Sequence, residues 1–575
     1  MKKSISDVQL KTLISAARGE VRSDLVIKNA KILNVFTGEL ETGDVAVSGG
    51  FIAGIGEYEG KEEIDAEGGI ICPGLIDSHI HIESSMLSPA EFARAVISHG
   101  TTSVITDPHE IANVVGEDGI EYMLEASKDL PLDVFFMLPS CVPATPLDES
   151  GAELDADALD RFYGNERVLG LAELMNSFGT VRGDGEIMRK ILGAVSHGKR
   201  IDGHAPMLSG KELNAYVSAG VKSDHECSFF EEAEEKLRRG QWIMVREGTA
   251  AENLEALLPL FDDKYCGRCL LATDDKHAGD LINKGHIDYI IRKAVKAGKS
   301  PYNAVKMATL NAAQYFSLED RGAVAPGYVA DLIIVSGLED FEVRKVFKSG
   351  KLVSENGKLV ADITVPKPDE EKYRRVFHSF NMGTVTAGDF KVEGVGSKKR
   401  VIKLIPGELL TEEVIVDAAD NKEIIKLAVI ERHKNTGHTG VGFVTGYGLK
   451  QGAIASSIAH DSHNLIVAGK NDEDMALAAN AVRMNEGGIA IALNGKIISE
   501  LALPIGGLMC GMDVHEVEDK LNLMKEQARQ LGVNEGIDPF MTLSFAALPV
   551  IPKLRILTQG VVDVSTQSYV PVLFD

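Results

Sequence analysis

Short apolar segments alternate with stretches of helical periodicity between about residue 70 and residue 315. Each apolar segment ends in polar or ionisable residues, a pattern typical of buried strands in a parallel α/β sheet. Eight strand ends can be assigned, at Asp77-Ser78-His79, Ile105-Thr106-Asp107, Met137-Leu138-Pro139, Leu171-Ala172-Glu173, Asp202-Gly203-His204, Ser223-Asp224-His225, Val245-Arg246-Glu247 and Ala272-Thr273-Asp274. Eight strand and helix units in a segment of this length predict a (β/α)8 barrel of the TIM type.

The segments on either side of the predicted barrel follow a different pattern. Apolar residues at near-helical spacing predict a short helix within residues 1–20, and β-rich runs separated by glycines follow over residues 24–64. A second β-rich run opens at Gly322 and continues through Val353. We expect the strands of both flanks to build one β-sandwich domain beside the barrel.

A chain of 575 residues is too long for one hydrophobic core, so the pattern divides into several folding units. A proline-rich, charged stretch that opens at Pro366 predicts a linker, and the β-alternation and helices beyond it predict an α+β C-terminal domain. The expected units are the N-terminal helix and first sandwich half over 1–69, the barrel over 70–320, the second sandwich half over 321–365, the linker over 366–384 and the C-terminal domain over 385–575.

The net charge of the chain limits the kinds of molecule that we expect it to bind. The chain has 60 Lys and Arg against 85 Asp and Glu, which gives a formal net charge of −25. This charge repels phosphate backbones and anionic lipid surfaces, so we expect neither nucleic acid nor a membrane as partner. A free nucleobase is neutral near pH 7 and is not repelled in this way. A small-molecule substrate is therefore expected, and the sequence leaves a homo-oligomer open.

The number of cysteines and the N-terminal residues indicate the cellular compartment. The six cysteines are too few and too scattered for a disulfide scaffold of this size. Lys2 and Lys3 are followed by polar residues that interrupt the apolar region of a signal peptide, and no stretch approaches the roughly 20 apolar residues of a membrane span. We expect a cytoplasmic protein.

The most informative chemistry lies at the predicted strand ends. His79 and His81 are two residues apart on an extended strand, so both imidazoles can face one metal ion, although a surface pair on an edge strand has the same spacing. Barrel enzymes build their sites at the carboxyl ends of the strands. More ligand types follow at later strand ends, namely Glu173, His204, His225 and Asp274. Four imidazoles and two carboxylates there predict a centre for two divalent ions.

The residues around these positions resemble the amidohydrolase superfamily, through Pro73-Gly74-Leu75-Ile76-Asp77-Ser78-His79-Ile80-His81 and Ala325-Pro326-Gly327-Tyr328-Val329-Ala330-Asp331. Within it, the chain is similar to adenine deaminases at His81-Ile82-Glu83-Ser84-Ser85-Met86, Thr106-Asp107-Pro108-His109-Glu110, Ala172-Glu173-Leu174-Met175-Asn176, Gly203-His204-Ala205-Pro206, Asp224-His225-Glu226 and Ala272-Thr273-Asp274-Asp275-Lys276-His277. The stretch His460-Asp461-Ser462-His463-Asn464 is similar to the extra C-terminal domain of that family. The resemblance covers nearly the whole chain.

This resemblance implies a ligand set for two metal ions. One ion is held by His79, His81 and Asp274, the other by His204 and His225, and the carboxylate of Glu173 bridges both. Many members of the superfamily place a carboxylated lysine where Glu173 stands. The resemblance also implies manganese(II) or iron(II), and a site of imidazoles and carboxylates is compatible with either.

The implied reaction is the hydrolysis of adenine to hypoxanthine and ammonia. Water is a poor nucleophile at neutral pH, and metal ions correct this by lowering the pKa of bound water toward about 7. Attack on C6 requires a proton at N1, and the amino group must be protonated to leave. We expect Asp274 to take the proton of the water and pass it on. Glu83, two residues beyond His81 on the same side of an extended strand, is the candidate donor to N1, with a charged loop residue as the other interpretation.

Five further residues are candidates for contact with the substrate, namely Asp107, Arg246, Asp275, His460 and His463. The first three follow predicted strands, where they can also orient metal ligands. The two histidines lie in a polar cluster that can close over the barrel mouth and exclude water, and a plain turn is the alternative.

Other functions compete with this interpretation. A different amidohydrolase acting on a cyclic amide is the main alternative, but such relatives usually carry the bridging lysine. Zinc deaminases of cytidine share the His-x-Glu and Cys-x-x-Cys types seen at His81-Ile82-Glu83 and Cys266-Gly267-Arg268-Cys269, yet Tyr265 stands where proline is expected. We therefore expect buried thiols there. A non-catalytic scaffold is disfavoured because the ligand set is complete.

Overall fold

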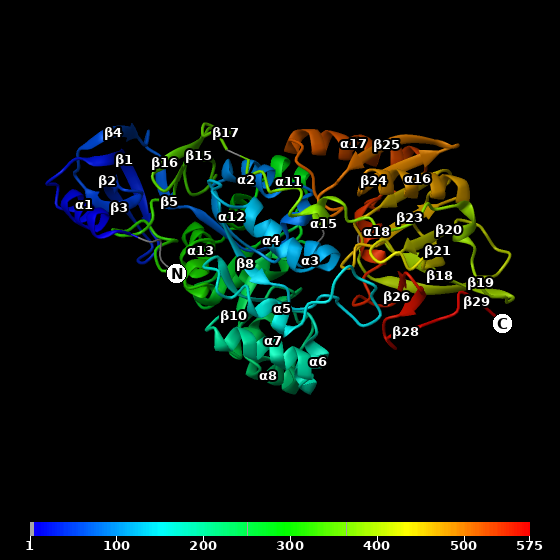
Figure 1. Ribbon diagram of the computed structural model, residues 1–575. Helices are drawn as coiled ribbons and strands as arrows, with labels where there is room; N and C mark the ends of the chain where they lie inside the picture. The colour runs from blue at the N-terminus through cyan, green and yellow to red at the C-terminus, as the bar shows by residue number, and fades with distance from the viewer. Residues whose placement is uncertain (1–4, 250, 364, 407) are drawn as a thin grey trace.

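The computed structural model describes residues 5–249, 251–363, 365–406 and 408–575. Three groups of elements follow one another along the chain, with the barrel strands between an N-terminal sheet and a C-terminal sheet (Figure 1). The chain begins with helix α1 (Asp7–Ala17), which a capping box of Ser6 and Gln9 opens. This helix lies within the predicted residues 1–20, of which residues 1–4 are outside the described chain. None of the described helices is both long and apolar enough to cross a membrane.

The two flanks of the barrel meet in one nine-stranded sheet. Strand β5 (Ile70–Pro73) pairs with β1 on one side and, antiparallel, with β14 (Leu332–Val335) on the other. Because the strands form one continuous sheet, the halves expected from the two flanks are joined by hydrogen bonds. The remaining strands are β1 (Ser23–Asn34), β2 (Glu39–Ser48), β3 (Phe51–Gly56), β4 (Gly60–Asp65), β15 (Val343–Lys348), β16 (Lys351–Glu355) and β17 (Lys358–Leu359).

Eight parallel strands form the central part of the molecule. They are β6 (Leu75–Ile80), β7 (Thr101–Thr106), β8 (Asp133–Leu138), β9 (Val168–Leu174), β10 (Arg200–Gly203), β11 (Ser223–Asp224), β12 (Trp242–Arg246) and β13 (Cys269–Ala272). They pair in chain order, in a group from β6 to β10 and a group from β11 to β13. A parallel bridge between Ile80 and Asp274 joins the last strand to the first, and Lys222 donates to the carbonyl of Ile201 at the other junction. The strands end at or next to the predicted triplets.

Helices alternate with these strands, which confirms the mixed α/β class. They are α2 (Pro89–Ile97), α3 (His109–Val115), α4 (Glu117–Ala126), α5 (Ala156–Asp160), α6 (Ser177–Arg182), α7 (Gly185–Ser196), α8 (Gly210–Ser218), α9 (Phe230–Arg238), α10 (Leu254–Leu257), α11 (Ala278–Asn283), α12 (Ile287–Lys296), α13 (Pro301–Met307) and α14 (Leu310–Tyr315). Helix α2 has a capped first turn, in which the hydroxyl of Ser88 accepts from the backbone of Glu91 and Pro89 occupies the first position. Glu91 is accordingly a structural residue.

The stretch expected as a linker packs against the barrel. It contains the short helix α15 (Arg374–Phe377), and the side chains of Tyr373 and Val376 are buried. The hydroxyl of Tyr373 donates to Glu125 on α4 over 2.7 Å. The connection between barrel and C-terminal region is therefore fixed by tertiary contacts.

The C-terminal region holds a second nine-stranded sheet, in the order β19-β18-β21-β20-β23-β22-β24-β25, with β29 beside β18. Its strands are β18 (Lys398–Leu404), β19 (Thr411–Asp417), β20 (Ile425–Ile430), β21 (Thr439–Thr445), β22 (Ala453–Ser456), β23 (Leu465–Gly469), β24 (Gly488–Leu493), β25 (Lys496–Ala502) and β29 (Leu573–Phe574). The other elements are α16 (Asp472–Met484), α17 (Val514–Gln530), α18 (Met541–Ala546), β26 (Leu554–Leu557), β27 (Gly560–Asp563) and β28 (Ser568–Tyr569). Strands and helices thus mix in this region, as the sequence predicted.

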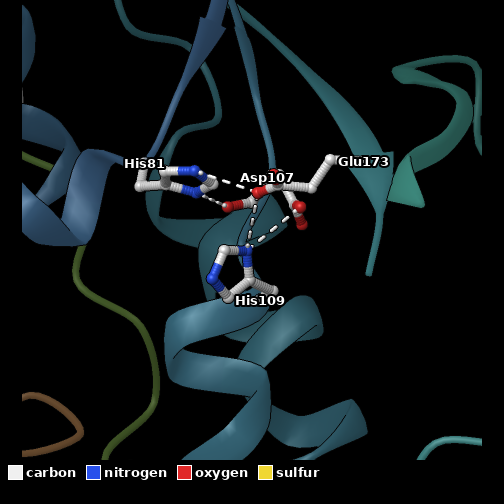
Figure 2. A group of neighbouring side chains, drawn as sticks. All are labelled: His81, Asp107, His109 and Glu173. Atoms are coloured by element: carbon white, nitrogen blue, oxygen red, sulfur yellow. Dashed lines mark hydrogen bonds and ion pairs between the residues drawn. The ribbon is translucent and has the colours of Figure 1, made fainter. Parts of the chain in front are cut away.

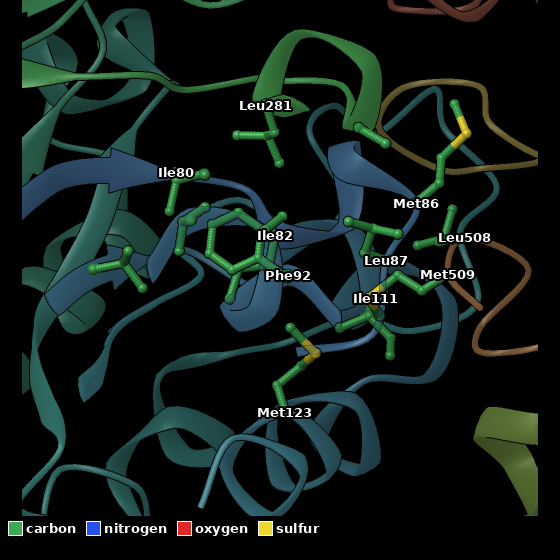
Figure 3. Packing of buried hydrophobic residues seen from close by; sticks show 14 of the residues in the cluster. Ile80, Ile82, Met86, Leu87, Phe92, Ile111, Met123, Leu281, Leu508 and Met509 are labelled. Atoms are coloured by element: carbon green, nitrogen blue, oxygen red, sulfur yellow. The ribbon is translucent and has the colours of Figure 1, made fainter. Parts of the chain in front are cut away.

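The C-terminal region docks on the loops that follow the first two barrel strands. The backbone of Cys510 accepts from Ser88 over 2.8 Å and donates to Met86 over 2.9 Å. Around these bonds, Leu87, Leu508 and other buried apolar side chains of both regions pack into one cluster (Figure 3). This contact fixes the C-terminal region beside the carboxyl ends of β6 and β7.

We predict that Leu87→Ala weakens this docking contact and destabilises the protein by about 2–5 kcal/mol, because a fully buried leucine is replaced by a cavity. Urea unfolding followed by the fluorescence of Trp242, the single tryptophan, measures the effect. Leu523→Ala is the control, because Leu523 is 52% exposed on α17 and its truncation opens no cavity. Equal losses in the two variants would contradict the prediction.

Candidate functional site

Six predicted ligand residues meet at the carboxyl ends of the barrel strands. His79 lies in strand β6, and His81 directly follows this strand. The other four residues come from β9, from the positions after β10 and β11, and from the turn after β13. All have buried side chains except His204, which is partly exposed. The remaining members are Glu173, His225 and Asp274. The structure thus brings together residues that are up to 195 positions apart, from His79 to Asp274.

Glu173 occupies the centre of this group. Its Oε1 lies 3.3 Å from Nε2 of His81 and 3.8 Å from Nε2 of His79. Its Oε2 lies 2.7 Å from Nδ1 of His204 and 3.2 Å from Nε2 of His225. Burial opposes the negative charge, but hydrogen bonds from the surrounding histidines outweigh it and hold the pKa of Glu173 well below its usual range. Each carboxylate oxygen therefore faces a different pair of imidazoles.

Asp274 uses its two carboxylate oxygens differently. Oδ1 faces the centre, 3.1 Å from Nε2 of His81 and 3.7 Å from Nε2 of His79. Oδ2 accepts a hydrogen bond of 2.6 Å from Arg246, which also pairs with Glu226. Burial opposes ionisation of Asp274, but the charge of Arg246 and the contact with His81 hold its pKa well below the usual value. Arg246 is thus an ion-pair partner of a predicted ligand, and it also lines the cavity described below.

The donor set fits divalent metal ions. The buried Nε2 atoms of His79 and His225 have no hydrogen-bond partner among the described residues, although carboxylate oxygens lie nearby. Burial, with the charge of His225 next, holds the pKa of His79 well below its usual value, so this ring is neutral and its lone pair is free to coordinate. Nδ1 of His81 lies 2.9 Å from the carbonyl of Asp107, which places its proton on Nδ1 and leaves Nε2 facing the carboxylates.

A further imidazole reaches the same centre. Nδ1 of His109, at the start of α3, lies 3.1 Å from Oδ2 of Asp107 and 3.5 Å from Oε1 of Glu173 (Figure 2). His109 is not among the site residues predicted from the sequence. The signal for it was its position directly after β7, in the Asp107-Pro108-His109 run. Asp107 acts here through its neighbours, since its carboxylate holds His109 and its carbonyl orients His81.

The prediction that Glu83 lies on an extended strand was wrong. Strand β6 ends at Ile80, and Glu83 lies in the 3-10 turn Ile82–Ser85 rather than on an extended strand. The side chain is nonetheless buried near His81, with Oε1 accepting from the backbone of Ile111 and Oε2 without a partner among the described residues. Burial raises the pKa of Glu83 to about 7.

A cavity of about 590 Å³ opens over this centre. Its barrel wall includes His81, His109, Glu173, His204, His225 and Asp275. Its other wall is mostly apolar and comes from the C-terminal region, with Leu409, Leu410, His460, Phe545, Leu548 and Ile551. A small organic molecule can therefore reach the carboxylates and imidazoles while one side of it packs on apolar side chains.

The two C-terminal histidines differ in their access to the cavity. His460 lines it. His463 does not, because its Nδ1 accepts from the backbone of Ala459 and its Nε2 donates to Glu110. Both ring nitrogens of His463 are thus engaged within the protein, and its contact with the substrate stays a prediction. Cys266 and Cys269 are buried and unpaired, as expected.

Comparison with known proteins agrees with this geometry. Residues 70–353 match the amidohydrolase family, and residues 403–568 match the adenine deaminase C-terminal domain. The chain is 48% identical to "adenine deaminase 2" of Carboxydothermus hydrogenoformans, over 98% of this chain and 99% of that protein. It is 47% identical to the adenine deaminase of Kosmotoga olearia, over 97% of this chain and 98% of that protein. The resemblance seen in the sequence is confirmed, and the chain belongs to the adenine deaminase family of amidohydrolases.

Proposed function

We propose that the protein hydrolyses adenine to hypoxanthine and ammonia. The observation that carries the proposal is the buried group of four histidines and two carboxylates at the mouth of the barrel, beside a cavity that accepts a small heterocycle. The names of relatives that align over almost their whole length support adenine as the substrate. Matches to the catalytic and to the C-terminal family both support the same activity.

We propose two divalent ions, manganese(II) or iron(II), as cofactors. One would be held by His79, His81 and Asp274 and the other by His204 and His225, with Glu173 between them, as the distribution of its two oxygens supports. When bound, such ions make water a stronger nucleophile at neutral pH.

The residues around the centre supply proton transfers and positioning. As water adds to C6 of adenine, Asp274 takes a proton from it, because Oδ1 faces the centre while Arg246 holds Oδ2. The buried carboxyl of Glu83, whose Oε2 has no partner among the described residues, gives a proton to N1. Asp274 then returns its proton to the amino group, the bond from C6 to that nitrogen breaks and ammonia leaves. The hydroxyl proton that remains on the oxygen at C6 passes to Glu83, which restores the acid and gives hypoxanthine. We propose that Asp275, which lines the cavity and whose carboxylate accepts from Ser84, contacts the purine edge.

We also propose boundaries for the domains and a cellular compartment for the protein. We propose domain boundaries at 70 and 320 for the barrel and at 385 for the C-terminal domain, with 1–69 and 321–365 as one sheet domain. Six buried, unpaired cysteines support a reducing compartment, and we propose the cytoplasm.

We predict that adenine is deaminated far faster than adenosine or AMP. Carboxylates such as Glu226 and Asp275 line the cavity and repel a phosphate, and a ribose has to fit between the predicted metal ligands and the apolar wall. Ammonia release from equal concentrations of the three compounds measures the preference. Equal turnover of adenosine and adenine would contradict a free-base deaminase.

We predict that Glu173→Gln retains at most one ion per chain, because a neutral amide is a much poorer bridging ligand than a carboxylate. Metal analysis after dialysis and the rate of ammonia release are the two measurements. Glu212→Gln, an exposed change on α8, is the control and should keep both ions. Two ions held at the parent affinity by Glu173→Gln would place the bridge elsewhere.

We predict that Asp274→Asn stays at least about a hundredfold slower than the parent protein even when excess manganese(II) fills the centre, because general acid–base groups contribute about 10²–10⁴-fold. The amide keeps an oxygen ligand but cannot accept the proton. His204→Asn, which removes only a ligand, should instead recover part of its activity as metal is added. A fully metallated Asp274→Asn protein with near-parental activity would show that the proton travels through another group.

A further inference from the structure

His460 and Asp461 are the polar residues that the loop between β22 and β23 brings to the cavity, and His460 is held there by contacts on two sides. It is 8% exposed, and its ring stacks on Phe545 of α18 with a centroid distance of 4.7 Å and an interplanar angle of 25°. Nδ1 lies 2.7 Å from Oε1 of Glu110, which belongs to the first turn of α3 on the barrel. Packing on one face and a hydrogen bond at one edge therefore fix the orientation of this ring.

Glu110 is shared between two histidines of the C-terminal region. Its Oε1 accepts from His460, and its Oε2 accepts from Nε2 of His463. Burial opposes the charge of Glu110, but the two histidines and His109 hold its pKa well below the usual range. We name Glu110, His460 and His463 the interdomain clasp, because it joins the barrel to the C-terminal region directly beside the cavity.

The clasp residues are also of the types that bind metal, so a third ion is the alternative to a hydrogen-bonded clasp. The tautomer of His463 argues against it. Nδ1 of His463 accepts from the backbone N–H of Ala459 over 3.2 Å, so the proton of the neutral ring resides on Nε2. Coordination through Nε2 would move that proton to Nδ1, where it would face the N–H of Ala459. The hydrogen-bonded arrangement is therefore favoured.

The second nitrogen of His460 remains free. Nε2 has no partner among the described residues, although the residue is more than nine-tenths buried and lines the cavity. Burial opposes protonation, but the charge and hydrogen bond of Glu110, with Asp275 and Asp461 nearby, raise the pKa of His460 to about 9. At neutral pH the ring is an imidazolium, and none of the residues that the structure describes accepts from its Nε2–H.

We propose that His460 contacts the substrate and donates its Nε2–H to a lone pair of the purine ring, at N3 or N7, with Glu110 and His463 as positioning residues. This inference rests on the proposed function. In adenine, N9 carries a hydrogen and N1 is engaged in the reaction, so N3 and N7 are the ring acceptors that remain. The C-terminal domain thereby supplies part of the specificity for a purine, and the clasp orients that part relative to the metal ligands on the barrel.

The first test compares His460→Leu with His460→Gln. Loss of a hydrogen bond from a charged donor corresponds to about ten- to a hundredfold in affinity. We expect KM for adenine to rise by about this factor in His460→Leu, with two ions retained and a smaller change in kcat. His460→Gln keeps an N–H donor and should give an intermediate KM. His438→Gln is the control, because His438 also pairs with a carboxylate, Glu149, but lies outside the cavity.

The second test identifies the acceptor with 3-deazaadenine and 7-deazaadenine as competitive inhibitors. We expect one of them to bind the parent protein weakly and to show no further loss in His460→Leu, because the contact is already absent. The other should lose affinity by the same factor as adenine. If both analogues bind the parent protein as tightly as adenine, or if both lose affinity equally in His460→Leu, neither nitrogen accepts from His460 and the proposal is overturned.

The third test addresses the clasp. Glu110→Gln should reproduce the KM of His460→Leu, and the double variant should be no worse than His460→Leu alone, because both changes remove the same contact. Three ions in the parent protein and two in Glu110→Gln would overturn the proposal in favour of a metal site. Metal-loaded protein without activity on adenine would refute the proposed function, whereas normal turnover with an unchanged KM in His460→Leu would refute this inference alone.

Discussion

The centre depends on the buried carboxylate of Glu173. A carboxylate removed from water is costly unless hydrogen bonds or cations compensate it, and here the compensation comes from histidines at the ends of three other strands, β6, β10 and β11. The strands are held at fixed spacing by the parallel sheet, so the distances around Glu173 are set by the backbone. The arrangement is therefore preorganised, and little rearrangement is required before ligands and substrate meet.

A second layer of contacts orients the groups that face Glu173. The carbonyl of Asp107 selects the tautomer of His81, and Arg246 restricts Asp274 to presenting one oxygen to the centre. These contacts come from loops after different strands. The function therefore depends on where each strand ends relative to its neighbours in the barrel, as well as on the ligands themselves.

The ligand set could be predicted from the sequence because it follows a local rule. His79, Glu173 and Asp274 each lie at the end of an apolar run, and strands of a parallel barrel end on the same face. The 3-10 turn that carries Glu83 could not be predicted in this way, because the choice between strand and turn depends on the packing of Ile82 beneath it. The pairing of Glu110 with His463 had no local signal, since it joins residues 353 positions apart in two domains. The family resemblance suggested that the C-terminal region matters, but only the tertiary contacts distinguish the roles of its two histidines.

The pairing of β5 with β14 has a consequence for the order in which the chain acquires its structure. Strand β5 leaves the ribosome before the barrel, whereas its neighbour β14 begins only at residue 332. During synthesis one side of β5 lacks its partner until the whole barrel sequence has been made, and an unpaired apolar edge such as Ile70-Ile71-Cys72 can pair with other chains. The N-terminal sheet is thus begun before the barrel and completed only after it, so slow translation of the barrel lengthens the exposure of this sheet to aggregation and to chaperones.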